Sequence, residues 1–473
     1  MRKIYMLFLG AALACASCND WLDVRPDTEQ KEKDMFSTYD GFCAAVTGMY
    51  MTMADRDIYG ERLSMTNIES LANLWYMADE SYRYEDYYLM QHDYSNVEYS
   101  QAAIEAIYAK LFNTIVQANV IIKNVNEQGG VIVDPAIRNT IQGEAYAVRA
   151  YCQLDVLRLF GQVPGGSQAV ELPYSETTGI DEMPAYYPFD EYVEKLKSDI
   201  AKAESLLKDN DPVFQYSFSE LNSYPETVDE FMYYRQSRMN YWAVKALEAR
   251  MYLYVGDKAQ AYRAAKEVMD ATLDGAPVMT MSGVADFAAG YKLCPSECLF
   301  YLSKYDVMEY SREFLVGDQQ RELGNAEMAF DVRSDMGLTE TRFNDLFMGC
   351  DVNTNNRYLY CWTTANDNYG QTMHVTDKYY WNTEASSQML HYQLIPMLRM
   401  SEVCLIAMEG TTDLAEANTL YQAYMLAHGE ANVSALASQE ELEDFLLAEY
   451  RREFFAEGQM FYTYKRLNAP TML

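Results

Sequence analysis

Two aromatic-rich stretches of the chain carry the side chains best suited to holding a sugar. Flat aromatic rings can stack on the C–H faces of sugar rings, while amides, carboxylates and arginines bond the hydroxyls. In both stretches these residues lie among Asn, Asp and Gly and not along a regular apolar stripe, which is typical of loop-borne binding residues. We therefore predict a ligand-binding site drawn from nine residues: Trp75, Tyr76, Asp79, Tyr82, Trp362, Asn366, Asp367, Tyr369 and Trp381.

Burial of these rings is the competing interpretation. The chain contains 41 tyrosines, and large rings usually pack in the core of a protein. The strongest individual candidates for ligand contact are Trp75, Trp362, Tyr369 and Trp381, because their neighbours are polar.

The sequence offers no recognisable catalytic set, so we predict no enzyme activity and no cofactor. With 70 Asp and Glu residues, apparent glycosidase carboxylate pairs are unavoidable, and none stands out by its surroundings. The chain lacks HExxH and GxSxG motifs and has four histidines, which are His92, His374, His391 and His428. A glycoside hydrolase is kept as an alternative.

The segment from Asp351 to Asn355 places oxygen side chains at alternate positions, as calcium loops do. The rest of that pattern fails, because the loop has no glycine at Asn356 and no glutamate at Trp362. We predict a polar turn there and no metal ligands.

The first residues have the layout of a cleaved lipoprotein signal. Arg2 and Lys3 precede an apolar run at 4–14, and Ala16-Ser17 lies directly before Cys18. We predict a signal peptide at 1–17, lipidation of Cys18 and a tether at 18–33; Cys15 is the competing acceptor, and a secreted protein without an anchor is the alternative.

Seven cysteines follow Cys18, an odd number that excludes a complete disulfide framework. Cys152 and Cys404 lie in helical apolar patterns and are predicted to be buried thiols. Local bridges between Cys294 and Cys298 and between Cys350 and Cys361 stay open.

Charge and composition exclude some classes of protein. The formal charge of −33 disfavours binding to nucleic acid. At 49% hydrophobic residues the chain is globular in composition, and no run after the signal is apolar enough to span a bilayer.

Apolar residues recur at helical spacing over most of the chain. The predicted helices cover 104–125, 135–160, 189–207, a pair within 240–269 that turns at Gly256-Asp257, 397–408, 414–426, and a last one opened by a capping box from Ser438 to Glu441. Within 240–269, the small and aromatic residues Ala249, Tyr252, Gly256, Ala261 and Ala265 have the spacing of a tetratricopeptide repeat.

We predict a mainly α-helical, tetratricopeptide-like scaffold in a single domain at 34–473. Irregular aromatic-rich insertions interrupt it at about 75–99 and 277–384, with only a few short strands. Seven charged residues lie on helices beside apolar residues and are predicted to form structural ion pairs. They are Arg149, Arg158, Glu402, Arg451, Arg452, Glu453 and Glu457.

Several segments together resemble the SusD/RagB family of nutrient-uptake lipoproteins. The segment 143–164, GEAYAVRAYCQLDVLRLFGQVP, resembles the signature helix of that family, and 111–119 carries its Ala-Asn pair. The segment 18–26 is similar to the family's opening and favours Cys18 over Cys15, while 395–402 and 451–461 match its two C-terminal signatures. One departure is Thr463, where family members commonly carry Asp.

This resemblance implies a helical scaffold whose insertions form the ligand-capturing face. It also implies a partner, a SusC-like TonB-dependent outer-membrane transporter, and a lipid-anchored protein at the cell surface that binds without cleaving. The expected function is capture of an oligosaccharide; a peptide or other nutrient is the alternative ligand, and a helical-repeat envelope adaptor is the alternative class. The matched signatures are scaffold positions, so they transfer no sugar-binding residue.

Overall fold

A computed structural model describes residues 27–77, 83–179, 182–315, 336–366, 370–380 and 393–472. The α-helices are α2 (Asp27–Met35), α3 (Tyr39–Met53), α4 (Asn67–Leu71), α5 (Tyr84–Met90), α6 (Ala102–Gln128), α7 (Pro135–Phe160), α8 (Phe189–Leu207), α9 (Phe218–Leu221), α10 (Tyr241–Tyr254), α11 (Lys258–Met269), α12 (Val284–Ala288), α13 (Val307–Leu315), α14 (Glu340–Leu346), α15 (Asn356–Tyr360), α16 (Met400–Gly410), α17 (Leu414–Ala427), α18 (Gln439–Glu453) and α19 (Met460–Arg466). The strands are β1 (Leu172–Pro173), β2 (Tyr186–Tyr187), β3 (Thr272–Leu273), β4 (Ala276–Pro277), β5 (Cys298–Ser303), β6 (Trp362–Asn366), β7 (Thr372–Thr376) and β8 (Leu394–Arg399).

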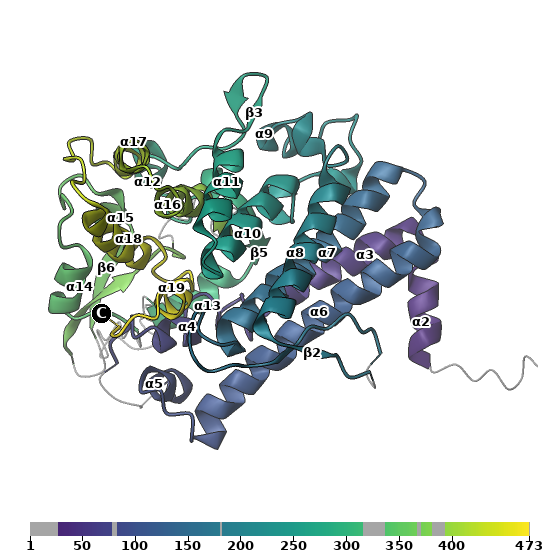
Figure 1. The fold of residues 1–473 in the computed structure, drawn as a ribbon, viewed down its shortest axis with the longest axis horizontal. Coiled ribbons are helices and arrows are strands. Elements are labelled where there is room, and N and C mark those ends of the chain that lie inside the picture. Colours follow the sequence, from purple (N-terminus) through teal and green to yellow (C-terminus); the bar gives the residue numbers. More distant parts are fainter. Residues whose placement is uncertain are drawn as a thin grey trace, which may run out of the picture.

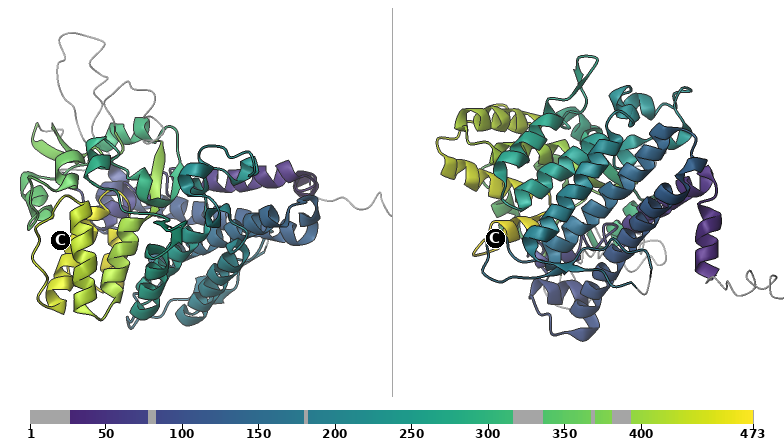
Figure 2. Two further views of the ribbon diagram at one scale, coloured as in Figure 1. Left: turned by 90° about the horizontal axis from the view of Figure 1, so that it is seen from above. Right: turned by 45° about the vertical axis from the view of Figure 1, so that its right-hand side comes forward.

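The scaffold is a row of helices in which successive members pack side by side. Helix α3 contacts α6, α6 contacts α7, and α7 contacts α8. The row continues through α10 and α11 to α16 and α17, and the two further views show the long helices running alongside one another (Figure 2). The predicted mainly α-helical, tetratricopeptide-like fold is confirmed.

Small residues allow these helices to approach closely. Gly143 on α7 faces α8, where an added Cβ would lie 2.9 Å from the Cγ of Leu207. Gly410 at the end of α16 faces α11, where a Cβ would lie 2.8 Å from the carbonyl oxygen of Lys258. A side chain at either position would push two core helices apart.

Most predicted helices are confirmed, and the exceptions have physical causes. The helix predicted at 397–408 is wrong at its start, because Leu394–Arg399 is strand β8, paired antiparallel with β5. A fully buried apolar strand has no alternation that distinguishes it from a helix. Ser438 caps α18 by accepting from the Glu441 amide, but the Glu441 carboxylate accepts from the Ala437 amide and not from the cap residue.

Two further expectations need correction. The predicted tether at 18–33 overlaps α2, which begins at Asp27 and whose Glu32 accepts a hydrogen bond from Asn124 of α6 at 2.8 Å. The open question of local disulfides is answered by free thiols at Cys294, Cys298, Cys350 and Cys361, and Cys152 and Cys404 are buried as predicted.

Buried ion pairs tie the scaffold together. Six of the seven predicted charges pair: Arg149 with Asp199, Arg158 with Asp155, Arg250 with Glu402, Arg452 with Glu449, and Arg399 with both Glu453 and Glu457. Arg451 pairs with no carboxylate among the described residues. The charged signature positions are therefore parts of the scaffold and not of a surface.

Helix α2 lies at one edge of the body and the C-terminus at the other (Figure 1). Among the described helices, none is long and apolar enough to cross a bilayer.

Candidate functional site

The first insertion forms a short helical arm that precedes α6 in the chain and consists of α5 and the turn at Val97–Gln101. Helix α5 is fixed to α4 by the Asp86 carboxylate, which accepts hydrogen bonds from Asn67 at 2.7 Å and Ser70 at 3.1 Å. The chain then enters α6 through a π-helical turn at Val97–Gln101, where the Asn96 side chain accepts from the Tyr99 amide. Such turns are frequent at functional sites, since the extra residue redirects a side chain.

Three tyrosine rings from this arm form a stack. Tyr84 lies on Tyr99 with ring centroids 4.8 Å apart and 17° between the planes, and Tyr88 lies 5.8 Å from Tyr99 at 3°. Tyr84 is 39% exposed. The stack therefore presents a flat aromatic surface on a part of the chain that the fold holds in place.

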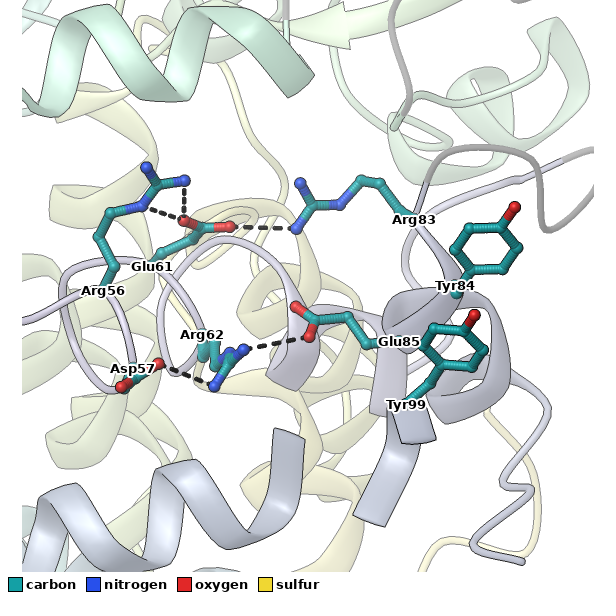
Figure 3. Close-up of a pocket in the computed structure, with 8 residues that line it drawn as sticks. All are labelled: Arg56, Asp57, Glu61, Arg62, Arg83, Tyr84, Glu85 and Tyr99. Atoms are coloured by element: carbon teal, nitrogen blue, oxygen red, sulfur yellow. Dashed lines mark hydrogen bonds and ion pairs between the residues drawn. The ribbon is translucent and has the colours of Figure 1, made fainter. Parts of the chain in front are cut away.

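This stack borders a cavity of about 460 Å³ lined by Arg56, Asp57, Glu61, Arg62, Arg83, Tyr84, Glu85 and Tyr99 (Figure 3). The volume is in the range of small-molecule sites. Three arginines and three carboxylates line it beside two rings, so the wall is rich in hydrogen-bonding groups and balanced in charge.

Two ion-pair groups order the charged wall. Glu61 lies between Arg56, at 2.6 Å, and Arg83, at 3.1 Å (Figure 3). Burial lowers the pKa of Arg83, but the carboxylates of Asp86 and Glu61 more than offset this and hold its pKa above its ordinary value. Arg83 therefore stays charged.

The second group joins the loop after α3 to α5. Arg62 donates to Asp57 at 2.8 Å and to Glu85 at 3.1 Å (Figure 3). The Arg62 side chain is 20% exposed and that of Asp57 is 40% exposed. Ion pairs that are held in place yet open to solvent leave lone pairs and N–H groups free for ligand hydroxyls.

Helix α13 backs this wall with aromatic rings. The guanidinium of Arg56 lies 4.5 Å from the ring centre of Tyr310, and that of Arg83 lies 4.8 Å from the ring centre of Phe314. These contacts fix long side chains that would otherwise lose entropy on binding a ligand.

Trp75, one of the strongest sequence candidates, is a core residue, and its predicted ligand contact is wrong. Its indole is 0% exposed, donates to the carbonyl of Met65 at 3.1 Å and packs edge-on against Phe455 at 4.7 Å. Trp362 packs against the same Phe455 at 4.8 Å and against Phe343 at 5.2 Å. The structure does bring the two insertions together, but through core packing.

The other predicted residues are spread out. Tyr76 packs on the small cluster of Ala365, Met373 and Val375. Asn366 is exposed at the end of β6. Asp79, Tyr82, Asp367, Tyr369 and Trp381 lie outside the described residues, as does Cys18.

The nine residues predicted from the sequence do not include the three tyrosines of the stack. The nearby Tyr84 and Tyr88 are spaced four residues apart, as neighbours on one helical face are. That spacing was the available signal; the contribution of Tyr99 depends on the π-helical turn, which has no sequence signature.

The oxygen-rich turn from Asp351 uses its side chains locally. The Asp351 carboxylate accepts from the Asn353 amide, and the Asn355 side chain caps α15 by accepting from the Arg357 and Tyr358 amides. No group of three or more His, Cys, Asp or Glu with metal-binding geometry occurs in the described part of the chain.

Comparison with known proteins gives three kinds of likeness. Residues 20–224 match the SusD-like family model described as "Starch-binding associating with outer membrane". SusD-like protein P2 of Formosa agariphila is 25% identical over 213 residues, which are 44% of this chain and 39% of that relative. The match therefore spans well under half of that relative's length.

Solved structures share the fold along nearly the whole chain. A SusD superfamily protein from Bacteroides thetaiotaomicron aligns with a TM-score of 0.68 at 20% identity, covering 91% of this chain and 89% of its own. A putative sugar-binding protein from Bacteroides vulgatus gives 0.66 at 18%, covering 91% and 87%. A laminarin-binding SusD-like protein gives 0.64 at 15%, covering 91% and 92%. The chain is therefore similar to SusD-like proteins in sequence over residues 20–224 and in fold along nearly its whole length.

Proposed function

We propose that this protein is a cell-surface lipoprotein that captures an oligosaccharide and delivers it to a TonB-dependent outer-membrane transporter. The observation that carries the proposal is the tyrosine stack of Tyr84, Tyr88 and Tyr99 beside a cavity with paired arginines and carboxylates. A sugar ring can stack on the exposed Tyr84 side while its hydroxyls bond to Arg62, Glu85 and their neighbours. A neutral ligand suits a wall whose charges already cancel.

The residues of the pocket favour binding of a glycan without cleavage. Glu61 is paired with two arginines, and Asp57 and Glu85 share a third. A glycosidase needs a carboxyl group that is free to donate its proton to the leaving oxygen, whereas each of these carboxylates is already engaged by an arginine. We expect purified protein to release no reducing sugar; a measurable release would support the hydrolase alternative.

Membrane attachment is proposed through Cys18 and rests on the sequence of the first 18 residues. Cys18→Ala should abolish labelled palmitate incorporation and shift the protein from membranes to the soluble fraction, with Cys15→Ala as the matched control. Palmitate incorporation that persists in Cys18→Ala and is lost in Cys15→Ala would move the anchor to Cys15.

The ligand class is tested by isothermal titration of the mature chain against two panels. The first holds oligosaccharides of laminarin, starch, xylan and mannan, and the second holds short peptides. Binding to at least one glycan supports the proposal, and binding to peptides alone would overturn it. Co-purification of a large β-barrel with the solubilised protein would support the transporter partner; recovery of the protein alone would count against it.

A further inference from the structure

A second group of exposed tyrosines lies away from the proposed glycan pocket, in the segment between α9 and α10. We call Tyr224, Tyr233 and Tyr234 the tyrosine corner. The Tyr224 ring lies 5.4 Å from Tyr233 at 85° and 5.6 Å from Tyr234 at 87°. The hydroxyls of Tyr224 and Tyr234 share a hydrogen bond, and the Tyr233 hydroxyl donates to the carbonyl of Pro225 at 3.1 Å. The rings thus meet at right angles in a hydrogen-bonded arrangement.

The two outer rings face solvent. Tyr224 is 59% exposed and Tyr234 is 40% exposed. Five residues near them in the chain are also exposed, and all are polar: Ser223, Glu226, Thr227, Asp229 and Glu230. The corner is therefore a small aromatic surface surrounded by polar residues, unlike the continuous apolar patch of a protein interface.

Both exposed tyrosines have a strained backbone. Tyr224 has φ of 58° and Tyr234 has φ of 52°, in the left-handed region that β-carbon-bearing residues disfavour. This conformation is unfavourable for such residues, and strain of this kind concentrates at functional sites. Glycine or asparagine would relieve the strain at either position, yet both hold tyrosine.

The core holds the Tyr234 backbone in place. The next residue, Arg235, is fully buried and pairs with Asp211 at 2.9 Å and with Glu144. Asn240 donates to the Arg235 carbonyl at 3.0 Å, and Gln236 donates to the carbonyl of Cys298 at 2.7 Å. The ring is thus displayed from a rigid base, which lowers the entropy lost when a ligand binds.

The corner and the pocket lie on different sides of the body. Helix α9, which precedes Tyr224, is at the upper edge of Figure 1, whereas α5, which carries Tyr84, is at the lower edge. Because this view looks down the shortest axis, the two features are separated along the broad face of the molecule. A ligand that contacts both must be long.

We propose that the tyrosine corner is a second glycan-binding surface, which takes a polysaccharide chain while the pocket holds one stretch or end of it. The inference rests on the proposed function and adds to it a preference for polymer over short oligosaccharide. Two ring faces at right angles can contact a pyranose on a face and on an edge, with the tyrosine hydroxyls positioned for its hydroxyls. Two linked contacts raise avidity for a polymer that spans both.

The test uses the mature chain in affinity gel electrophoresis through laminarin, soluble starch, xylan and mannan, with titration of oligosaccharides of the same glycans in parallel. The variant Tyr224→Asn/Tyr234→Asn removes both rings, and asparagine tolerates the left-handed conformation. We expect about tenfold weaker retention by polymer, with the oligosaccharide affinity unchanged. Tyr224→Phe/Tyr234→Phe keeps the ring faces and should retain most of the binding.

The outcomes separate this inference from the proposed function. Tyr84→Ala/Tyr99→Ala should lose oligosaccharide binding and keep weak polymer retention, which disappears when the corner is also removed. If the corner variant binds every polymer as wild type does, the inference is overturned while the pocket stands. If only co-purification with a β-barrel is lost, the corner is a protein interface and the inference is wrong. If wild type binds no glycan in either assay, both proposals fall.

Discussion

Replacing Arg399 by methionine should destabilise the fold strongly and in a pH-dependent way. The Arg399 side chain is 4% exposed, and its guanidinium contacts Glu457 at 2.9 Å, Glu453 at 2.7 Å and Glu297. It joins strand β8 to the end of α18 and to the turn before β5, three segments far apart in sequence. Its loss leaves buried carboxylates without their shared cation.

The three carboxylates differ in the partners that they keep when Arg399 is removed. Glu453 keeps Arg357 at 2.8 Å and Glu457 keeps Lys378 at 2.8 Å. Glu297 keeps hydrogen bonds from Ser401 and from the Ser282 amide, but no other cation pairs with it among the described residues. Removing one member of a buried ion pair costs about 3–5 kcal/mol. For a chain of 473 residues this is a fall in Tm of about 3–5 °C.

The sign of the pH dependence follows from Glu297. Burial raises the pKa of Glu297 and Arg399 works against this effect, so removal of Arg399 raises the pKa further. A carboxylate with a raised pKa in the folded state contributes stability below its unfolded pKa and loses it as pH rises. The destabilisation by Arg399→Met should therefore be larger at pH 8 than at pH 5.

Urea unfolding of wild type and variant at both pH values measures this difference. In a double-mutant cycle, Arg399→Met/Glu297→Gln should regain part of the free energy of unfolding that Arg399→Met loses at pH 8. Arg62→Met, which breaks partly exposed pairs with Asp57 and Glu85, is the matched control and should cost about 1 kcal/mol or less. The reasoning would be refuted if Arg399→Met lowered the free energy of unfolding by less than Arg62→Met does. It would also be refuted if Arg399→Met lowered that free energy equally at pH 5 and pH 8.

Three further substitutions test the stability of the fold. Burial and then Arg357 lower the pKa of His428 to about 3, so its stabilising contribution is complete above pH 6.5 and is lost as pH falls toward 3. In His428→Gln the urea midpoint should therefore change less between pH 6.5 and pH 4 than it does in the wild type. A midpoint that changes equally with pH in both proteins would contradict burial of a neutral ring. Gly458 has φ of 73°, and a Cβ there would lie 2.0 Å from the carbonyl oxygen of Leu63, so Gly458→Ala should cost at least about 2 kcal/mol. Gly48 in α3 has no atom within 4 Å of an added Cβ, so Gly48→Ala should instead stabilise by about 0.5–1 kcal/mol; equal urea midpoints for the two variants would contradict this account of the backbone.

The helical scaffold could be predicted because its signals are local. The residues of α8 were predicted as 189–207, the bounds that the structure shows, since apolar spacing and helix breakers lie within the segment itself. Strand β8 could not be separated from α16, because both are buried and apolar. The difference depends on pairing with β5, about a hundred residues earlier.

The candidate site was predicted by region but not by residue. Trp75 and Tyr84 are nearby aromatics in one insertion, and the sequence alone favoured the tryptophan. Whether a ring is buried depends on distant partners: Phe455 packs on Trp75 from the C-terminal signature. Tyr84 stays 39% exposed, and its stacking partner, Tyr99, comes from a π-helical turn.

The central claim is that the tyrosine stack and the charged cavity beside it hold a glycan, and oligosaccharide titration of Tyr84→Ala/Tyr99→Ala tests it most directly. The control is Tyr186→Ala, which removes a 55% exposed tyrosine that does not line the cavity. We predict that the double variant keeps the wild-type Tm and binds at least about tenfold more weakly, since aromatic anchors of this kind contribute about 2 kcal/mol or more. Wild-type affinity in the double variant, for a glycan that the wild type binds, would contradict the account.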